Sequence, residues 1–101
     1  MKLVYRPLFL ADVEQCADYL AAEAGEVVAA AWFKALKQAL QHIQDAPKIG
    51  RVRQDLPMPE IRTFNLRKYP NYLVFYRLQK GAIELLRIRH GMMNLPELFS
   101  E

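Results

Sequence analysis

The last third of the chain most limits what it can fold into. Residues 61–91 hold three strand-like apolar runs, of which the first and the last have polar or basic residues interleaved, and short polar connections separate the runs. A period of two is the pattern of β-strands, so we expect strands over residues 60–66, 72–78 and 82–89. Gly81 lies in the second connection, where it suits the positive φ angle of a tight hairpin turn. These runs therefore predict a three-stranded antiparallel meander.

The middle run is apolar at every position over residues 72–76, which read YLVFY. An uninterrupted apolar run of this length is typical of a central strand with both faces covered. The segment that precedes the meander, residues 45–59, contains Pro47, Pro57 and Pro59 and is expected to be a loop with little regular structure.

Helical periodicity dominates the first half of the chain. After a short strand at residues 2–6, apolar positions recur at helical spacing over residues 8–22 and 26–44. Gly25 separates the two expected helices, which should form an antiparallel hairpin. On the first helix, Asp12 belongs to the polar face together with Glu14, Gln15 and Asp18.

This order of elements predicts an α+β fold: one strand, a helical hairpin and three further strands, with the hairpin packed on a small, mostly antiparallel sheet. A length of 101 residues suits a single domain over residues 1–101. The lone cysteine, Cys16, excludes an intrachain disulfide, and no metal-ligand spacing is present, so we expect neither metal nor cofactor. The single cysteine fits a reducing compartment and predicts a cytoplasmic protein. No run approaches the ~18 apolar residues that span a bilayer, so we expect no membrane partner.

Positive charge is concentrated in the second half. Residues 48–89 hold ten Lys and Arg against three Asp and Glu, a net charge of +7, whereas residues 1–47 and 90–101 each carry −2. A chain with such asymmetry presents a basic face, which suits an acidic partner such as nucleic acid or an acidic protein segment. The alternative is a solvated basic surface without a partner.

Several of these residues together resemble a known family. Pro47 and Gly50, then Arg62, the run YLVFYR at residues 72–77 and the run IELLRIRHG at residues 83–91 are similar to the P-x-x-G, R, Y-x-V-x-Y-R and I-x-I-L-R-x-x-H-G pattern of the ParE/RelE toxin superfamily of bacterial type II toxin–antitoxin systems. The resemblance covers nearly the whole chain. It implies one of two activities: metal-free cleavage of messenger RNA on the ribosome in the RelE-like branch, or inhibition of DNA gyrase in the ParE-like branch.

The positions that the RelE-like branch uses for RNA cleavage are altered. Leu73 stands where that branch commonly has an arginine, and Met92 and Met93 stand where a basic residue is usual. Gly91 or Phe99 occupies the place of the catalytic tyrosine, and neither can exchange a proton. The resemblance therefore favours a ParE-like toxin that acts by binding and that a cognate, ParD-like or other acidic-tailed antitoxin neutralises. Met93 and Asn94 also replace the basic and acidic pair usual after His-Gly in this superfamily.

The basic strand residues are the candidate contacts for the target or the antitoxin. The predicted set is Arg62, Arg77, Arg87, Arg89, His90, Met92 and Met93. The alternative for the arginines is an internal ion pair with Glu84, Glu60 or an acid of the first helix. Since side chains two apart share a strand face, Arg77 should lie with Leu73 and Phe75, and Arg87 and Arg89 with Ile83 and Leu85. The alternative for His90 is a packing role beside Tyr76 or at strand-end carbonyls.

Two other functions stay open. One is a divergent ribosome-dependent RNase that uses Arg77, Arg87 and His90, with the ribosome and mRNA as its partners. The other is an inactive family member that only binds its antitoxin.

Overall fold

The computed structural model describes residues 1–91, and it has the α+β architecture that the sequence predicts. The elements follow in the order β1 (Lys2–Tyr5), α1 (Pro7–Ala24), α2 (Glu26–Asp45), β2 (Arg51–Val52), β3 (Arg62–Leu66), β4 (Tyr69–Gln79) and β5 (Ala82–His90). After α2 ends at Asp45, the segment up to residue 59 contains only the two residues of β2, so the expected loop with little regular structure is confirmed. Two residues are too few to show a strand period, and β2 forms because it pairs with β3.

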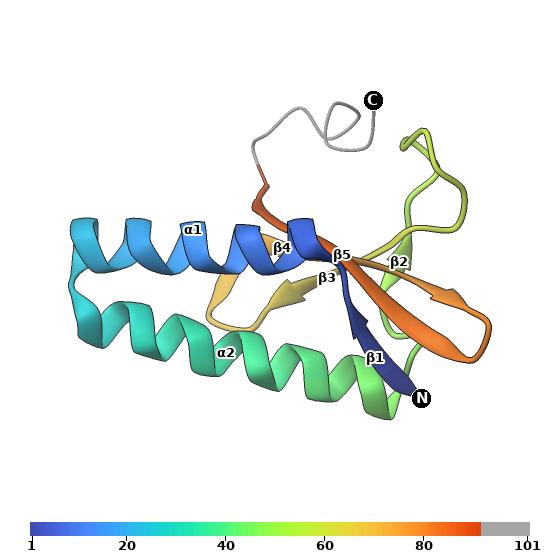
Figure 1. Cartoon of the computed structure of the whole chain (residues 1–101), viewed down its shortest axis with the longest axis horizontal. Coiled ribbons are helices and arrows are strands. Elements are labelled where there is room, and N and C mark those ends of the chain that lie inside the picture. The colour runs from blue at the N-terminus through green and yellow to red at the C-terminus, as the bar shows by residue number, and fades with distance from the viewer. Residues whose placement is uncertain (92–101) are drawn as a thin grey trace.

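The strands form one sheet in the order β1-β5-β4-β3-β2 (Figure 1). Its neighbours pair antiparallel except β1, which runs parallel to β5 with Leu3 beside Ile83. The predicted mostly antiparallel sheet is thus confirmed. Strand β4 lies in the middle, as its continuous apolar run indicated.

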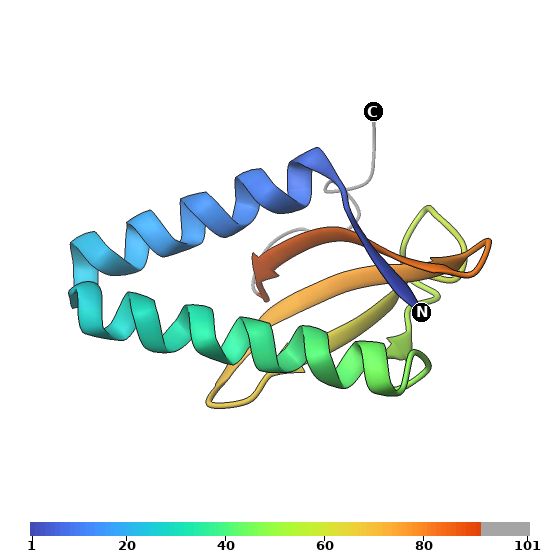
Figure 2. The same ribbon diagram turned by 60° about the horizontal axis from the view of Figure 1, so that its bottom comes forward.

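Helices α1 and α2 lie side by side and antiparallel, and their connection is at the end of the molecule away from the sheet in both views (Figures 1 and 2). One stripe of α2 is buried, at the spacing of three and four residues that a helix gives to one face. The stripe consists of Trp32, Ala35, Leu36, Ala39, Leu40 and Ile43. It packs in one cluster with Val74, Tyr76, Ile83, Leu85 and Ile88 of the sheet.

The opposite face of the sheet has a smaller core. Leu56 and Ile61, from the segment between β2 and β3 and its end, pack there with Phe75 of β4 and Leu86 of β5. Burying one such side chain contributes roughly 1.5–3 kcal/mol. Strand β4 is therefore covered on both faces, as predicted.

Some boundaries differ from the prediction for local reasons. Helix α1 begins at Pro7, because proline has no backbone N–H to satisfy in the first turn and its φ angle already suits a helix. Strand β4 begins at Tyr69, three residues early, because the turn after β3 is short and includes Lys68 at φ 73°. At the β4–β5 turn, Lys80 and Gly81 have φ angles of 53° and 76°, which confirms the positive φ predicted for Gly81.

A β-bulge in β5 changes which face its later side chains occupy. Tyr76 lies opposite Leu85 but Phe75 lies opposite Arg87, so Leu86 is an extra residue between them. Beyond it, Arg87 and Arg89 face the same side as their partners Phe75 and Leu73. The expectation that these arginines share a face with Ile83 and Leu85 was therefore wrong, because strand parity holds only without an insertion.

The Tyr76 hydroxyl fixes the segment that follows α2. It donates a hydrogen bond to the carbonyl oxygen of Pro47 (2.7 Å) and accepts one from the amide of Gly50 (2.8 Å). Arg62 donates through Nη1 to the carbonyl oxygens of Lys48 (3.1 Å) and Gly50 (2.8 Å). A Cβ on Gly50 would lie 2.6 Å from the Tyr76 hydroxyl oxygen, so only glycine fits there. We call these contacts the Tyr76 network.

Removing the Tyr76 hydroxyl should destabilise the fold. In Tyr76→Phe the buried Gly50 amide and Pro47 carbonyl lose their partner, which we expect to lower the free energy of unfolding by about 1–3 kcal/mol in urea titrations. Tyr5→Phe is the matched control, because Tyr5 is 47% exposed. Equal stability of both variants would show that the network contributes nothing.

Candidate functional site

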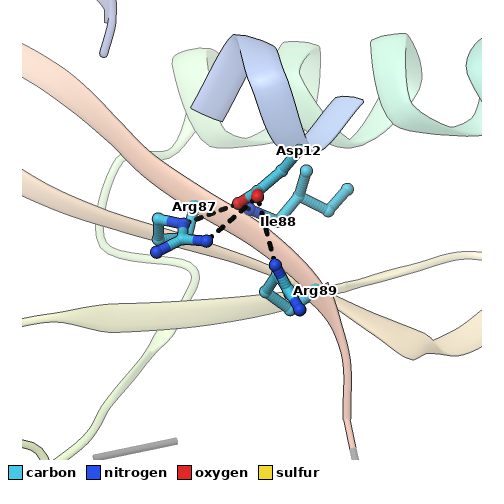
Figure 3. A network of polar contacts seen from close by, with 4 residues as sticks. All are labelled: Asp12, Arg87, Ile88 and Arg89. Carbon is cyan, nitrogen blue, oxygen red and sulfur yellow. Dashed lines mark hydrogen bonds and ion pairs between the residues drawn. The ribbon is translucent and has the colours of Figure 1, made fainter. Parts of the chain in front are cut away.

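A buried carboxylate joins α1 to the end of β5. Asp12 is 3% exposed, although the sequence placed it on the polar face of its helix. Its Oδ2 accepts hydrogen bonds from Arg87 Nε (2.7 Å) and from the Ile88 amide (3.2 Å). Its Oδ1 accepts from Arg87 Nη2 (3.0 Å) and, at a longer 3.4 Å, from Arg89 Nη1. Figure 3 shows Asp12 reaching from α1 to these three residues.

The place of Asp12 follows from the short length of β1. That strand pairs with β5 only from Ala82 to Leu85, and the amide of Arg6 adds one bond to the Leu85 carbonyl (3.1 Å) before α1 begins. Within the described residues no strand borders the later part of β5 on this side. Asp12 therefore accepts the Ile88 N–H that a neighbouring strand would otherwise satisfy.

The ion pairs offset the cost of burying the charge. An isolated carboxylate is expensive to remove from water, and removing one partner of a buried pair typically costs about 3–5 kcal/mol. Arg87 binds Asp12 through two parallel N–H groups, the geometry that suits a carboxylate best. The arrangement fixes α1 against β5 and orients both guanidinium groups.

Beside this ion-paired cluster lies a hollow of about 670 Å³, which we call the α1–β5 pocket. It is lined by Asp12, Gln15, Cys16, Tyr19, Leu20, Tyr72, Arg89 and His90. The ring of Tyr72 packs edge-on between Trp32 (centroids 5.5 Å apart) and His90 (5.2 Å). Aromatic and apolar walls with a few polar groups at one end are typical of a binding site.

The structure brings only some of the predicted site residues together. Arg89 and His90 line the α1–β5 pocket, and Arg87 is joined to Arg89 through Asp12. Arg62 belongs to the Tyr76 network, and Arg77 forms an ion pair with Glu84 (2.6 Å). Met92 and Met93 lie outside the described residues.

Arg77 is also too far from His90 to act on the same group. His90 lies opposite Tyr72 and Arg77 lies five residues further along β4, which corresponds to about 16 Å. Arg77, Arg87 and His90, the set considered for RNA cleavage, therefore do not surround one point.

The alternative roles expected for the arginines and His90, internal ion pairs and packing, are confirmed in part. Arg77 pairs with Glu84, and Arg87 and Arg89 pair with an acid of the first helix, as that alternative proposed. Glu60 takes part in none of the ion pairs found within residues 1–91. His90 packs against Tyr72, not beside Tyr76, because its strand pairing places it opposite Tyr72.

Sequence reasoning missed most of the pocket. Asp12, Gln15, Cys16, Tyr19 and Tyr72 were not among the candidate site residues. One signal was present: two arginines late in the last strand need a carboxylate, and the first helix is rich in acids. Which of Asp12, Glu14 and Asp18 pairs with the arginines depends on the position of the helix relative to β5, and the sequence does not give that position.

Between residues 1 and 91 no three His, Cys, Asp or Glu side chains are grouped so that they could hold a metal ion. In the same residues no helix combines the length and the apolar character needed to span a membrane.

Comparisons with known proteins agree on one family. A family model described as the ParE toxin of type II toxin–antitoxin system, parDE, matches residues 3–95. Toxin ParE3 of Caulobacter vibrioides is 35% identical over 71 residues, which cover 70% of this chain and 67% of that protein. A chain from the solved chromosomal ParDE toxin–antitoxin system of P. aeruginosa has a TM-score of 0.75 and 21% identity, and covers 89% of this chain and 95% of that one. At that identity the likeness is one of fold.

Neutralising Asp12 should destabilise the fold more than any surface change on the same helix. In Asp12→Asn the mostly buried guanidinium of Arg87 loses the charge of this carboxylate, which should lower the free energy of unfolding by about 3–5 kcal/mol in urea titrations. Asp18→Asn, at an exposed position of α1, should change it by less than about 0.5 kcal/mol. If Asp12→Asn lowered the free energy of unfolding no more than Asp18→Asn does, Asp12 would have no stabilising role.

Cys16 should be a slow nucleophile. Burial, then the nearby Asp12 charge, raises the pKa of its thiol from 9.0 to about 11, against a smaller opposing effect of Arg89. The native chain should therefore react with iodoacetamide with a pH midpoint near 11, and at pH 9 only about 1% of the thiol should be ionised. In urea the midpoint should return to about 9.0. A native midpoint near 9 would contradict the burial of this thiol.

Proposed function

Because the chain belongs to the ParE toxin family of type II toxin–antitoxin systems, we propose that it binds and inhibits DNA gyrase and that a cognate antitoxin neutralises it. The family membership confirms the resemblance that the motifs indicated, and with it the ParE branch of the superfamily. The target and the antitoxin are the proposed part. Both partners would be met in the cytoplasm.

The observation that carries the proposal is the α1–β5 pocket with basic residues at one end. Arg89 and His90 stand where β5 ends, next to the apolar side chains of Leu20 and Tyr72 and to Tyr19, which is 61% exposed. Aromatic residues and arginine are the side chains enriched in protein interfaces. The pocket therefore suits a protein segment that carries an acid beside apolar groups.

Two titratable groups of the pocket, Cys16 and Tyr72, are unsuited to general-base catalysis. Burial keeps Cys16 a thiol, and burial also raises the pKa of Tyr72, with smaller contributions from Cys16 and Tyr19. A general base needs a pKa near the working pH, which neither group has. Leu73, at the position where the RelE-like branch has arginine, packs against the apolar cluster of Phe75.

An antitoxin segment would bind in the same α1–β5 pocket. Acidic and apolar residues in a disordered tail can fold as they bind, with the apolar side chains in the pocket and the acids near Arg89 and His90. Arg62, Arg77, Met92 and Met93 stay predicted contacts for the target or the antitoxin. Arg62 and Arg77 would act from other parts of the surface, since neither lines this pocket.

A purified gyrase supercoiling assay tests the target. We expect the purified chain to inhibit supercoiling, and we expect Tyr19→Ala and His90→Ala to raise the inhibiting concentration about tenfold if each loses roughly 1.4 kcal/mol of contact free energy. Tyr5→Ala is the matched control, because Tyr5 is an exposed aromatic residue outside the pocket. It should inhibit like the unaltered chain.

Three outcomes would favour other functions. Unchanged supercoiling at saturating concentration would refute gyrase as the target. Codon-periodic cleavage of ribosome-bound mRNA would establish the RNase alternative. Harmless expression of the chain without its antitoxin would support an inactive family member that only binds the antitoxin.

A further inference from the structure

A second exposed surface lies where α2 ends. Two adjoining hollows, of about 480 and 260 Å³, share Lys48 and Leu78 in their linings. We call the combined area the α2-end surface and define it by Met1, Pro47, Lys48, Ile49, Val52 and Leu78. Figures 1 and 2 place the N-terminus beside this end of α2. Gln44 Nε2 donates a hydrogen bond to the Met1 carbonyl oxygen (2.9 Å).

Three exposed apolar residues lie together on the α2-end surface. Met1 and Ile49 are each 48% exposed and Val52 is 40% exposed, and all three border the joined hollows. Scattered exposed apolar residues are normal on a protein, whereas a contiguous exposed patch commonly marks an interaction site.

The Tyr76 network makes this surface rigid. It holds the backbone of Pro47 and Gly50 against the core through the Tyr76 hydroxyl, and Lys48 through its carbonyl oxygen. The side chains of Lys48 and Ile49, between these anchored positions, are exposed. A partner that binds there orders little additional chain, so less conformational entropy opposes binding.

The charge of this surface is mainly positive. Lys48 and Arg62 line it, and none of the ion pairs among residues 1–91 includes either of them. Arg62 instead donates to carbonyl oxygens, so its charge is not neutralised by a carboxylate. Glu60 also lines the second hollow, which leaves one net positive charge among the lining residues.

We propose that the α2-end surface is a second docking site, which binds a short partner-protein segment carrying acidic residues beside apolar ones. A second copy of this chain is a poorer occupant, because a symmetric contact would bring the Lys48 and Arg62 groups of both copies together. Leu78 lies six residues along β4 from Tyr72, so this surface and the α1–β5 pocket are about 20 Å apart. The two surfaces can be occupied at the same time, whatever the toxin target is.

Selection from a random peptide library on the immobilised chain tests the proposal. We expect enriched peptides in which Asp or Glu adjoins Leu, Ile or Phe. In fluorescence-polarisation titrations they should bind the double variant Lys48→Glu, Ile49→Asp at least about tenfold more weakly, a loss of roughly 1.4 kcal/mol. Lys34→Glu with Val27→Asp is the matched control, because it makes the same charge change at exposed positions of α2. That control should bind as the unaltered chain does.

Other outcomes would overturn the proposal. Selection without acidic peptides, or equal binding by the double variant and the control, would show that this surface is not the site. A different result would be Lys48-dependent binding to phosphatidylglycerol vesicles or to duplex DNA, without binding to any peptide. It would show that the partner is a lipid surface or a nucleic acid and not a protein segment. Matching thermal unfolding of the two double variants would show that any loss of binding is not a loss of folding.

Discussion

The carboxylate of Asp12 joins the first helix to the end of the last strand. It accepts from the side chain of Arg87 and the backbone of Ile88, so one group from α1 satisfies both a guanidinium and a strand edge. This bond is possible because β1 is short and the chain enters α1 beside β5. The length of β1 therefore determines where the helical hairpin lies, and with it the wall of the α1–β5 pocket.

The bulge at Leu86 is the second constraint on that site. Without the extra residue, Arg87 and Arg89 would continue on the face of Ile83 and Leu85, against the main core, where a guanidinium could not remain solvated. With it, Ile88 takes the core position and both arginines reach Asp12. One inserted residue thus separates the basic groups from the core while the strand stays paired.

These two constraints explain which parts of the fold and of the pocket could be predicted from the sequence. The helical spacing of residues 8–22 and 26–44 predicts the helices, because burial of one helix face needs that spacing, and the uninterrupted apolar run at residues 72–76 predicts the central strand. A bulge leaves no trace in a strand whose apolar residues occur on both faces, as in the run ELLRI at residues 84–88. The burial of Asp12 was hidden for a related reason, since an acid on a polar helix face becomes buried only when another element covers it. The pocket depends on both features, and the sequence therefore indicated its basic end but not its walls.

The family motif has a different role from the one that its basic residues suggest. Pro47, Gly50, Arg62 and Tyr76 contact one another through the Tyr76 network, so these motif positions stabilise the scaffold. The side chains of Lys48 and Ile49, which lie between Pro47 and Gly50, take no part in this network, and they are exposed on the α2-end surface. The same holds at the α1–β5 pocket, where Tyr19 lies outside the motif. A scaffold built this way can change its partners by substitutions at exposed positions, because those positions contribute little to the stability of the fold.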